Sequence, residues 1–257
     1  IIHTDSLEIQ TMQTLDNSVI LVTGANRGIG KAMVESFLAA GAAKVYAAAR
    51  RQATLDPLVD ANPRRVVPLR IDVTEPESVG AAAQAAVDVQ VVVNNAGVLE
   101  VASPLEGKAV EALTREMTVN VHGLLHVAQA FAPVLKANGG GVFVQMNSVA
   151  SMKNFAGFST YSASKAAAYS ITQGLRELLA EQGTGVLSVH PGPIATDMAA
   201  SAGLDGIAEP ASVVPDAIIA ALATDDFHVF PDTMARQIGG AYRDFARDIV
   251  EADLMAG

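Results

Sequence analysis

Short apolar runs alternate with amphipathic stretches along nearly the whole sequence. The apolar runs are rich in valine and bounded by turn residues, which is typical of strands buried on both faces of a sheet. The expected strands are Val19–Thr23, Val45–Ala49, Val66–Ile71, Val89–Val93, Val142–Met146, Val186–His190 and the short His228–Phe230. The expected helices are Ile29–Ala40, Glu75–Val87, Lys108–Lys136, Tyr161–Glu181, Ala211–Leu222 and a terminal helix from Gly239 to Met255. Because strands that alternate with helices form right-handed crossovers, the sequence predicts one doubly wound α/β domain with a mostly parallel seven-stranded sheet.

The start of the chain and its composition set further limits. Residues 1–15 are expected to form a tail before a single domain at residues 16–257, and residues 1–11 to be appended or processed, because Met12 is a more natural start than Ile1. The chain has no cysteine, which excludes disulfides and thiolate metal sites and favours a cytoplasmic location. A net charge of -10 argues against nucleic-acid binding, and the apolar runs are too short to cross a membrane.

A glycine-rich segment, Thr23-Gly24-Ala25-Asn26-Arg27-Gly28-Ile29-Gly30, joins the first strand to the first helix. Glycines at this place allow a tight turn and let the backbone approach a pyrophosphate, which the amino end of the helix can bind through its free N–H groups. The alternative is a plain turn. The position between a strand and a helix favours a dinucleotide site.

The spacing of these glycines, T-G-x-x-x-G-x-G, resembles that of the short-chain dehydrogenase/reductase family. Further motifs occur in that family's order: Asn94–Gly97 after the fourth strand, Asn120 in the long helix, Tyr161–Lys165 in the next helix and Pro191-Gly192 after the sixth strand. The resemblance implies one Rossmann-type domain, a nicotinamide cofactor and a Ser/Tyr/Lys catalytic set assisted by Asn. It therefore implies an oxidoreductase that moves a hydride between NADP(H) and a small-molecule carbonyl compound or alcohol.

The resemblance also implies roles for single cofactor-binding residues. Asp72 would hydrogen-bond the adenine, and Ile194 and Thr196 would hold the carboxamide of the nicotinamide. Asp72 could instead be only a turn residue, and Thr196 or Asp197 only a helix cap. The expected cofactor-binding residues are Gly24, Asn26, Arg27, Gly28, Ile29, Gly30, Arg50, Asp72, Val73, Asn94, Ala96, Gly97, Tyr161, Lys165, Pro191, Gly192, Ile194 and Thr196.

The end of the second strand indicates which cofactor is preferred. An acidic residue there would accept hydrogen bonds from a ribose 2′-hydroxyl and would repel a 2′-phosphate. Ala49 stands at this place and Arg50 follows it, with a planar, permanently charged guanidinium that suits a phosphate. Arg27 is expected to add a second cation. The arginines could instead be solvated surface residues, but the missing acid favours NADP(H).

Tyr161 and Lys165 lie four residues apart and therefore share one face of a helix. A nearby ammonium and the positively charged nicotinamide ring would stabilise the phenolate and lower the pKa of Tyr161 from its usual value of about 10. The phenol would then exchange a proton with the substrate oxygen. By the family spacing, Ser148 rather than Ser151 would hydrogen-bond this oxygen. Asn120 would interrupt its helix and help to hold a water that links Lys165 to solvent.

A substrate pocket is expected outside the carboxyl ends of the strands, lined by apolar side chains. Such a pocket desolvates an apolar substrate readily, so the sequence predicts medium-sized hydrophobic or aromatic ketones and aldehydes rather than sugars, nucleotide sugars or acyl-phosphopantetheine substrates. Val98, Val101 and Leu204 are further candidates, although Val98 and Leu204 could be core. The expected pocket residues are Leu99, Met152, Phe155, Phe158 and Met198.

Two other functions on the same fold stay open. One is a non-catalytic NADP-binding regulator, against which the retention of Ser148, Tyr161 and Lys165 argues. The other is a lyase or epimerase that retains its cofactor and shows no net cofactor turnover. No metal site is expected, because His122 and His126 have the spacing of zinc ligands without a third ligand nearby.

A homodimer or homotetramer is expected as the assembly. A dimer would form across the long helices Lys108–Lys136 and Tyr161–Glu181. The residues after the last strand depart from the V-D-G-G ending that is usual in the family's tetramers, so the two assemblies are not distinguished.

Overall fold

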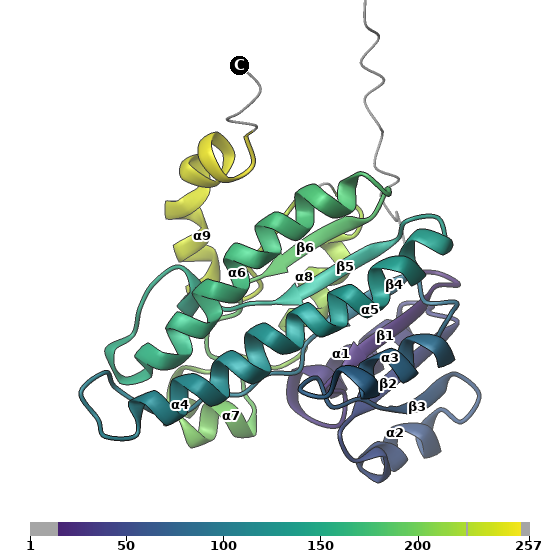
Figure 1. The fold of residues 1–257 in the computed structure, drawn as a ribbon, viewed down its shortest axis with the longest axis horizontal. Helices are drawn as coiled ribbons and strands as arrows, with labels where there is room; N and C mark the ends of the chain where they lie inside the picture. Colours follow the sequence, from purple (N-terminus) through teal and green to yellow (C-terminus); the bar gives the residue numbers. More distant parts are fainter. Residues whose placement is uncertain (1–14, 225, 253–257) are drawn as a thin grey trace, which may run out of the picture.

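A sheet of seven parallel strands forms the centre of the fold, as the sequence predicts (Figure 1). The computed structural model describes residues 15–224 and 226–252, so the expected appended segment 1–11 lies outside the described residues. The strands lie in the order β3-β2-β1-β4-β5-β6-β7, which reverses between β1 and β4 and so places a crevice at their carboxyl ends. Their bounds are β1 Val19–Thr23, β2 Lys44–Ala49, β3 Val66–Arg70, β4 Val91–Asn94, β5 Val142–Met146, β6 Gly185–Val189 and β7 His228–Val229.

Helices cover both faces of the sheet (Figure 1). The helices α1 (Gly28–Ala39) and α8 (Val213–Ala221) pack on one face, and α3 (Pro76–Ala85), α5 (Gly123–Ala137) and α6 (Ser159–Ala180) pack on the other. The remaining helices are α2 Asp56–Ala61, α4 Ala109–Glu116, α7 Asp197–Ser201 and α9 Thr233–Phe245. The sequence does not predict α2 and α7, because a helix of one or two turns is too short to show periodicity. Within the described residues, we find no helix with the length and apolar character of a membrane span.

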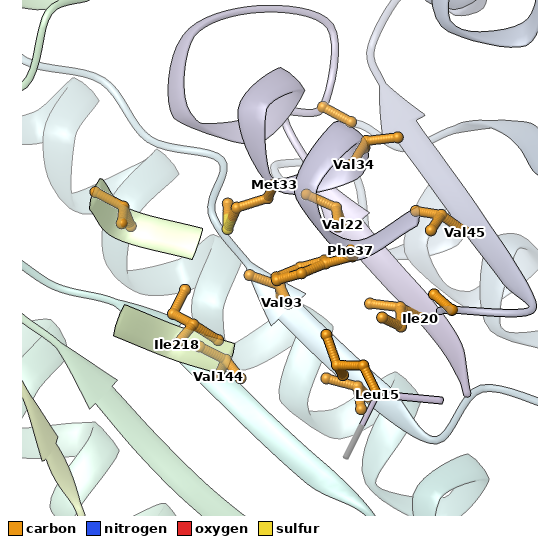
Figure 2. Packing of buried hydrophobic residues seen from close by; sticks show 14 of the residues in the cluster. Leu15, Ile20, Val22, Met33, Val34, Phe37, Val45, Val93, Val144 and Ile218 are labelled. Carbon is orange, nitrogen blue, oxygen red and sulfur yellow. The ribbon is translucent and has the colours of Figure 1, made fainter. Parts of the chain in front are cut away.

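The first strand illustrates why the apolar runs are continuous. Ile20 and Val22 face α1, where they pack near Met33 and Phe37 (Figure 2). Leu21 points to the opposite face, into the second apolar cluster. Both faces of β1 are therefore buried, and each such side chain contributes roughly 1.5–3 kcal/mol of transfer free energy.

The long helix expected at Lys108–Lys136 is interrupted. A π-helical segment, Met117–His122, separates α4 from α5, and Asn120 lies within it, as expected. The Asn120 amide nitrogen donates to the Val98 carbonyl at 2.9 Å, and its Oδ1 accepts from the Val98 N–H at 2.9 Å. The interruption thus joins this helix to the loop that follows β4, a common use of π-helical turns near functional sites.

The terminal helix expected at Gly239–Met255 begins earlier than predicted. α9 starts at Thr233 because the side chain of Asp232 caps it and accepts the N–H of Ala235 at 2.9 Å. A π-helical segment, Ala246–Val250, follows α9, and the end of the expected helix lies outside the described residues.

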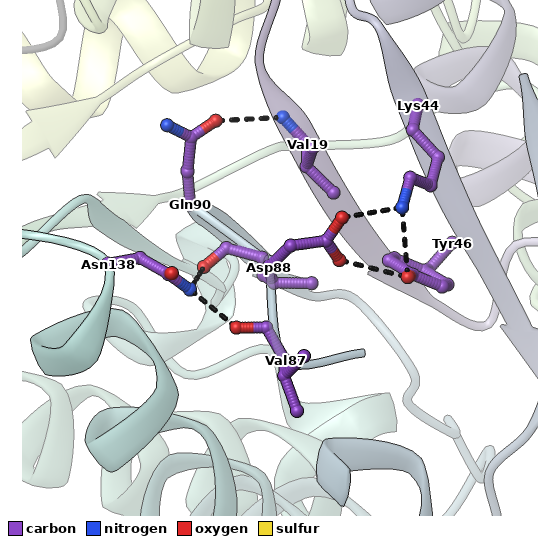
Figure 3. A network of polar contacts seen from close by, with 8 residues as sticks. Val19, Lys44, Tyr46, Val87, Asp88, Gln90 and Asn138 are labelled. Atoms are coloured by element: carbon purple, nitrogen blue, oxygen red, sulfur yellow. Dashed lines mark hydrogen bonds and ion pairs between the residues drawn. The ribbon is translucent and has the colours of Figure 1, made fainter. Parts of the chain in front are cut away.

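A polar network holds the strands together at their amino ends, away from the crevice (Figure 3). Lys44 Nζ lies 2.5 Å from Asp88 Oδ2, and the Tyr46 hydroxyl donates to Asp88 Oδ1 at 2.9 Å. Gln90 accepts the N–H of Val19 at 3.1 Å at the start of β1. These contacts fix the edge of the sheet that is opposite the site and leave the carboxyl ends free to form it.

Candidate active site

Two adjoining cavities open at the carboxyl ends of the strands. The first, about 270 Å³, is lined by Ser148, Tyr161 and Lys165, and we call it the tyrosine cleft. The second, about 480 Å³, is lined by the glycine-rich segment, and we call it the glycine-loop cleft. Gly97 and Thr196 line both, so the two clefts are continuous.

The glycines of the first loop are required by close contacts. A Cβ on Gly30 would lie 2.2 Å from the carbonyl oxygen of Gly24. Gly28 has φ +53°, and a Cβ there would lie 3.0 Å from Thr196 Cγ2. The loop can therefore approach its neighbours this closely only because Gly28 and Gly30 carry no side chain. Arg27 precedes α1 without a side-chain capping bond, so the first N–H groups of α1 stay available to an anion.

The predicted catalytic residues come together in the tyrosine cleft, from two elements. Ser148 follows β5, and Tyr161 and Lys165 lie one turn apart on α6. Lys165 is buried and donates through Nζ to the carbonyl of Met146 at 2.7 Å. Ser148 Oγ accepts the N–H of Ala150 at 3.1 Å, which caps a short 3-10 turn at Val149–Ser151.

Burial controls the protonation of this cleft. It lowers the pKa of Lys165 to about 8. It raises the pKa of Tyr161 to about 12, although the hydroxyl of Ser148 acts to lower it. In the chain alone the pKa of Tyr161 is therefore shifted in the direction opposite to the lowering expected beside the bound cofactor, because desolvation of the phenolate outweighs its stabilisation by neighbouring groups. The contribution of the nicotinamide ring stays a prediction.

Asn120 lies behind the cleft and braces it. Its Nδ2 donates to Ser164 Oγ at 2.9 Å, and its other side-chain contacts go to Val98. A Cβ on Gly97 would lie 3.2 Å from Asn120 Oδ1 and 3.7 Å from Lys165 Nζ, so glycine lets α6 and the loop after β4 approach each other. Both amide hydrogens of Asn120 are taken by the protein, so any water at Asn120 would have to donate, to Oδ1 or to its main-chain carbonyl.

Comparison with known proteins decides the family. Residues 18–205 match the family described as short chain dehydrogenase. The chain belongs to this family. It is 32% identical over 207 residues to the short chain dehydrogenase pigC of Monascus ruber, a match that covers 76% of this chain and 68% of that protein. It is 34% identical over 204 residues to a galactitol 2-dehydrogenase (L-tagatose-forming) of Cereibacter sphaeroides, covering 75% and 77% of the two chains.

A solved structure agrees in fold. A short chain dehydrogenase from Burkholderia cenocepacia J2315, in complex with NADP, superposes with a TM-score of 0.83 at 36% identity, covering 93% of this chain and 99% of that one. This short-chain dehydrogenase is thus an oxidoreductase that uses NAD(P), with the seven-stranded Rossmann-type fold of the family.

The glycine-loop cleft of the dehydrogenase fits a dinucleotide. Its bare glycines and the uncapped amino end of α1 suit a pyrophosphate. Arg27, Arg50 and Arg51 line the same cleft, and no carboxylate ends β2, where Ala49 is 5% exposed. Arg27 also lies 2.9 Å from Asp197 at the start of α7, in an exposed ion pair.

The loop after β3 closes the far end of this cleft. Asp72 and Val73 both line it, as expected. Asp72 Oδ1 accepts the N–H of Thr74 at 3.0 Å and its hydroxyl at 2.7 Å, so Asp72 also has the turn role that the sequence left open. His126 Nδ1 lies 2.8 Å from the carbonyl of Val73, which ties the loop to α5.

The family resemblance implies that Asn94 supports both the adenine ribose side of the cofactor and the central sheet, and its contacts within the chain are those of the second role. It is 3% exposed and lines neither cleft. Its side chain accepts from the Thr23 hydroxyl at 3.2 Å and donates to Gln145 Oε1 at 2.8 Å, so it joins β1, β4 and β5. Ala96 and Gly97, two and three residues later, do line the glycine-loop cleft.

The loop after β6 completes the tyrosine cleft. Pro191, Gly192, Ile194 and Thr196 line it, as expected for cofactor-binding residues. Thr196 Oγ1 also accepts the N–H of Ala199 at 3.3 Å, so it caps α7 as well. The remaining expected cofactor residues line the glycine-loop cleft: Gly24, Asn26, Arg27, Gly28, Ile29, Gly30 and Arg50.

Two residues of this region escaped the sequence analysis. Buried Asp232 accepts the N–H of Gly192 at 2.6 Å while it caps α9, so one carboxylate fixes both the loop and the helix. Met234, two residues later, lines the tyrosine cleft. An aspartate followed by a helical stretch is a capping signal, but the distance in sequence from the family motifs hides its contact with the site.

The apolar wall of the tyrosine cleft contains most of the expected pocket residues. Leu99, Phe155, Phe158 and Met198 line it, and so do Val98 and Leu204. Two expectations are wrong. Met152 packs against the apolar cluster under α5 and α6, because the 3-10 turn after Ser148 directs it inward. Val101 is 41% exposed and lies outside the cleft.

Metal binding finds no support. Among residues 15–224 and 226–252, no three His, Cys, Asp or Glu side chains are grouped to hold an ion. His126 is engaged with Val73, and His122 lies in the π-helical segment before α5.

Proposed function

We propose that this dehydrogenase transfers a hydride between NADP(H) and a medium-sized hydrophobic ketone or aldehyde, or the corresponding alcohol. The observation that carries the proposal is the continuity of the two clefts. Ser148, Tyr161 and Lys165 line one wall of an apolar cavity whose other end opens into the arginine-lined glycine-loop cleft. Such a cavity removes an apolar carbonyl compound from water and presents it to a few polar groups.

The preference for NADP(H) is supported by charge. Arg50 forms no ion pair with a carboxylate of the described residues, and Arg51 and Arg27 line the same cleft. A 2′-phosphate would meet these cations, and a ribose 2′-hydroxyl would find no acidic acceptor at Ala49. The NADP in the Burkholderia cenocepacia relative supports the same choice.

The chemistry follows from the polar groups of the tyrosine cleft. Bound NADPH supplies the hydride that the carbonyl carbon receives. Ser148 would hydrogen-bond the carbonyl oxygen and hold the negative charge that develops there. Tyr161 would give its phenolic proton to this oxygen, so that C=O becomes CH–OH. With a pKa raised by burial, the phenol is protonated at neutral pH, which is the form that donates in carbonyl reduction.

Lys165 would assist the same proton transfer. Its ammonium is held by Met146 beside the Tyr161 ring and would stabilise the phenolate left after proton transfer. Apolar side chains that line the same cleft, among them Phe155, Leu99 and Met198, would exclude water from the reacting atoms.

Loss of NADPH absorbance with a panel of substrates tests the proposal. The panel contains hydrophobic and aromatic ketones and aldehydes on one side, and tagatose, a nucleotide sugar and an acyl-phosphopantetheine on the other. We expect the higher kcat/KM for the first group. A clear preference for a sugar, a polyanion or a carrier-bound substrate would contradict the substrate class, and bound cofactor without net turnover would indicate a lyase or epimerase. The homodimer or homotetramer and the cytoplasmic location expected from the sequence stay predictions.

A further inference from the structure

His190, the residue after β6, is a buried titratable group that the chemistry above does not use. It is 0% exposed and lines neither cleft. Burial lowers the pKa of its imidazole to about 3, so at neutral pH the ring is neutral and has one N–H donor and one acceptor nitrogen. Its neighbours determine which nitrogen carries the hydrogen.

The side chains of Asn147 and Ser188 determine the state of Nε2. Thr172 gives its hydroxyl hydrogen to the Ala168 carbonyl at 2.7 Å, so the group of Asn147 that faces Thr172 at 3.3 Å is its NH₂. The same amide nitrogen donates to Ser188 Oγ at 2.9 Å. Ser188 therefore directs its own hydrogen to His190 Nε2, 2.7 Å away, and Nε2 is the acceptor.

The ring hydrogen then lies on Nδ1, which faces the turn that begins at Ser148. Nδ1 is 2.9 Å from Ser151 Oγ and 3.2 Å from the carbonyl oxygen of Ser148. Ser151 donates its hydroxyl hydrogen to that same carbonyl oxygen. The hydrogen bonds thus run in one direction, from Asn147 through Ser188 and His190 to the main chain of Ser148. Both ring nitrogens of His190 have partners, which fixes the ring, while Asn147 Oδ1 at the far end of the network has none among the described residues.

The other side of Ser148 faces the tyrosine cleft. Its backbone is extended, with φ -169° and ψ 159°, and its hydroxyl accepts from Ala150 while it lines the cleft. Because the carbonyl is held, the Cα–Cβ direction is fixed, and the hydroxyl can be displaced only by rotation about χ1.

We propose that His190 is a positioning residue, which fixes the main chain of Ser148 through Nδ1 and Ser151 so that the Ser148 hydroxyl meets the substrate oxygen. This inference rests on the proposed function, in which Ser148 bonds that oxygen. Removal of one such hydrogen-bond donor costs ~10²–10³-fold in kcat, so a loosened Ser148 is expected to cost about ten- to a hundredfold.

Three variants separate positioning from simple packing. His190→Leu removes the hydrogen bonds of both ring nitrogens, and we expect kcat to fall by about ten- to a hundredfold while the Kd for NADPH is unchanged. His190→Asn places an amide N–H near the Nδ1 position and is expected to recover most of kcat. Ser188→Ala removes the donor to Nε2 but leaves the Ser148 carbonyl, which can only accept and so keeps the ring hydrogen on Nδ1, so Tm is expected to fall while kcat stays at the wild-type value. A folded His190→Leu protein with wild-type kcat overturns the proposal, and so do losses of kcat that parallel those of Tm in all three variants.

A double-mutant cycle with Ser148→Ala shows whether His190 acts through Ser148. If it does, His190→Leu has no further effect on kcat in the Ser148→Ala background, whereas additive losses overturn the positioning role. If His190→Leu does not fold, Ser151→Ala removes the intermediate hydroxyl and gives the same cycle, with the same two outcomes. Full activity of Ser148→Ala alone would instead contradict the role of Ser148 in the proposed function.

Discussion

The ammonium nitrogen of Lys165 lies 5.8 Å from the centre of the Tyr161 ring, one turn away on α6. It reaches this place buried, with the Met146 carbonyl as a hydrogen-bond acceptor 2.7 Å away. Desolvation disfavours the charged form of both the buried Lys165 ammonium and the partly buried Tyr161 phenol, while the charge of one would stabilise the opposite charge of the other. The pair is therefore costly for folding and useful for proton transfer.

Replacement of Tyr161 by phenylalanine removes the proton donor and keeps the ring. We expect kcat to fall by ~10²–10⁴-fold, with little change in the Kd for NADPH, because the hydroxyl is a positioned acid rather than a main cofactor contact. Steady-state kinetics and a fluorescence titration of NADPH measure the two quantities. Tyr46→Phe, at the amino ends of the strands, is the control and is expected to keep wild-type kcat. Wild-type turnover in Tyr161→Phe would contradict the assignment.

Replacement of Lys165 by methionine should abolish turnover and change how stability depends on pH. The pKa of Lys165 is lowered by burial to about 8 from its ordinary 10.5, so between these values the unfolded chain binds more protons than the folded one. The free energy of unfolding of the wild-type protein is therefore expected to rise as pH increases from about 8 toward 10. In Lys165→Met this rise disappears.

Urea denaturation across this pH range measures the effect of Lys165. Lys136→Met, at an exposed position near the end of α5, is the matched control and keeps the rise. Tyr161 has its pKa raised to about 12 and acts in the opposite direction, but only above pH 10, its ordinary pKa. If the free energy of unfolding of the wild-type protein is flat or falls between pH 8 and 10, the contacts of the Lys165 ammonium offset its desolvation and its pKa is not lowered.

Much of the fold follows from local patterns, because the parallel strands are buried on both faces. Val19–Thr23 and Val142–Met146 end where the sequence predicts, since a valine-rich run bounded by turn residues has no other way to bury both sides. The ends of the helices differ for local reasons, such as the cap at Asp232. The interruption of the helix at Asn120 is indicated by the family motif and hidden from periodicity, and the contact with Val98 that accompanies it is not predicted by either.

The parts of the site that the sequence missed depend on register and on long-range contacts. His190 contacts Ser151, and reaches Asn147 through Ser188, only because β5 and β6 pair in parallel, with Met146 beside Val189. Met234 reaches the tyrosine cleft through a helix that follows the last strand. No local pattern gives these contacts. The prediction for Met152 was wrong for the opposite reason. Met152 is near Ser148 in sequence, but the turn directs its side chain toward the apolar cluster under α5 and α6.

Replacement of Arg50 by aspartate should reverse the cofactor preference. The change removes a cation from the glycine-loop cleft and places an acid near the ribose 2′ position, which repels a 2′-phosphate and accepts from a 2′-hydroxyl. We expect the Kd ratio of NADH to NADPH to fall by tenfold or more, about 1.4 kcal/mol per tenfold. Titration with each cofactor measures it, with Arg64→Asp, at an exposed position outside the cleft, as the control. An unchanged ratio would assign the phosphate to other residues.

Replacement of Phe155 by alanine tests the apolar wall of the tyrosine cleft. Phe155 lines the same cleft as the predicted catalytic residues and is half-buried, so its ring has apolar surface that can cover a ligand. Loss of that contact is expected to raise KM for aromatic ketones about tenfold, with kcat nearly unchanged, because the ring contacts ground state and transition state alike. A small aliphatic ketone, too short to reach the ring, should show no change.

Phe245→Ala, at a ring that is 54% exposed on α9, is the control. Equal losses for both ketones would mean that the mutation disturbs the catalytic residues, and no loss for either would place the substrate elsewhere in the cleft.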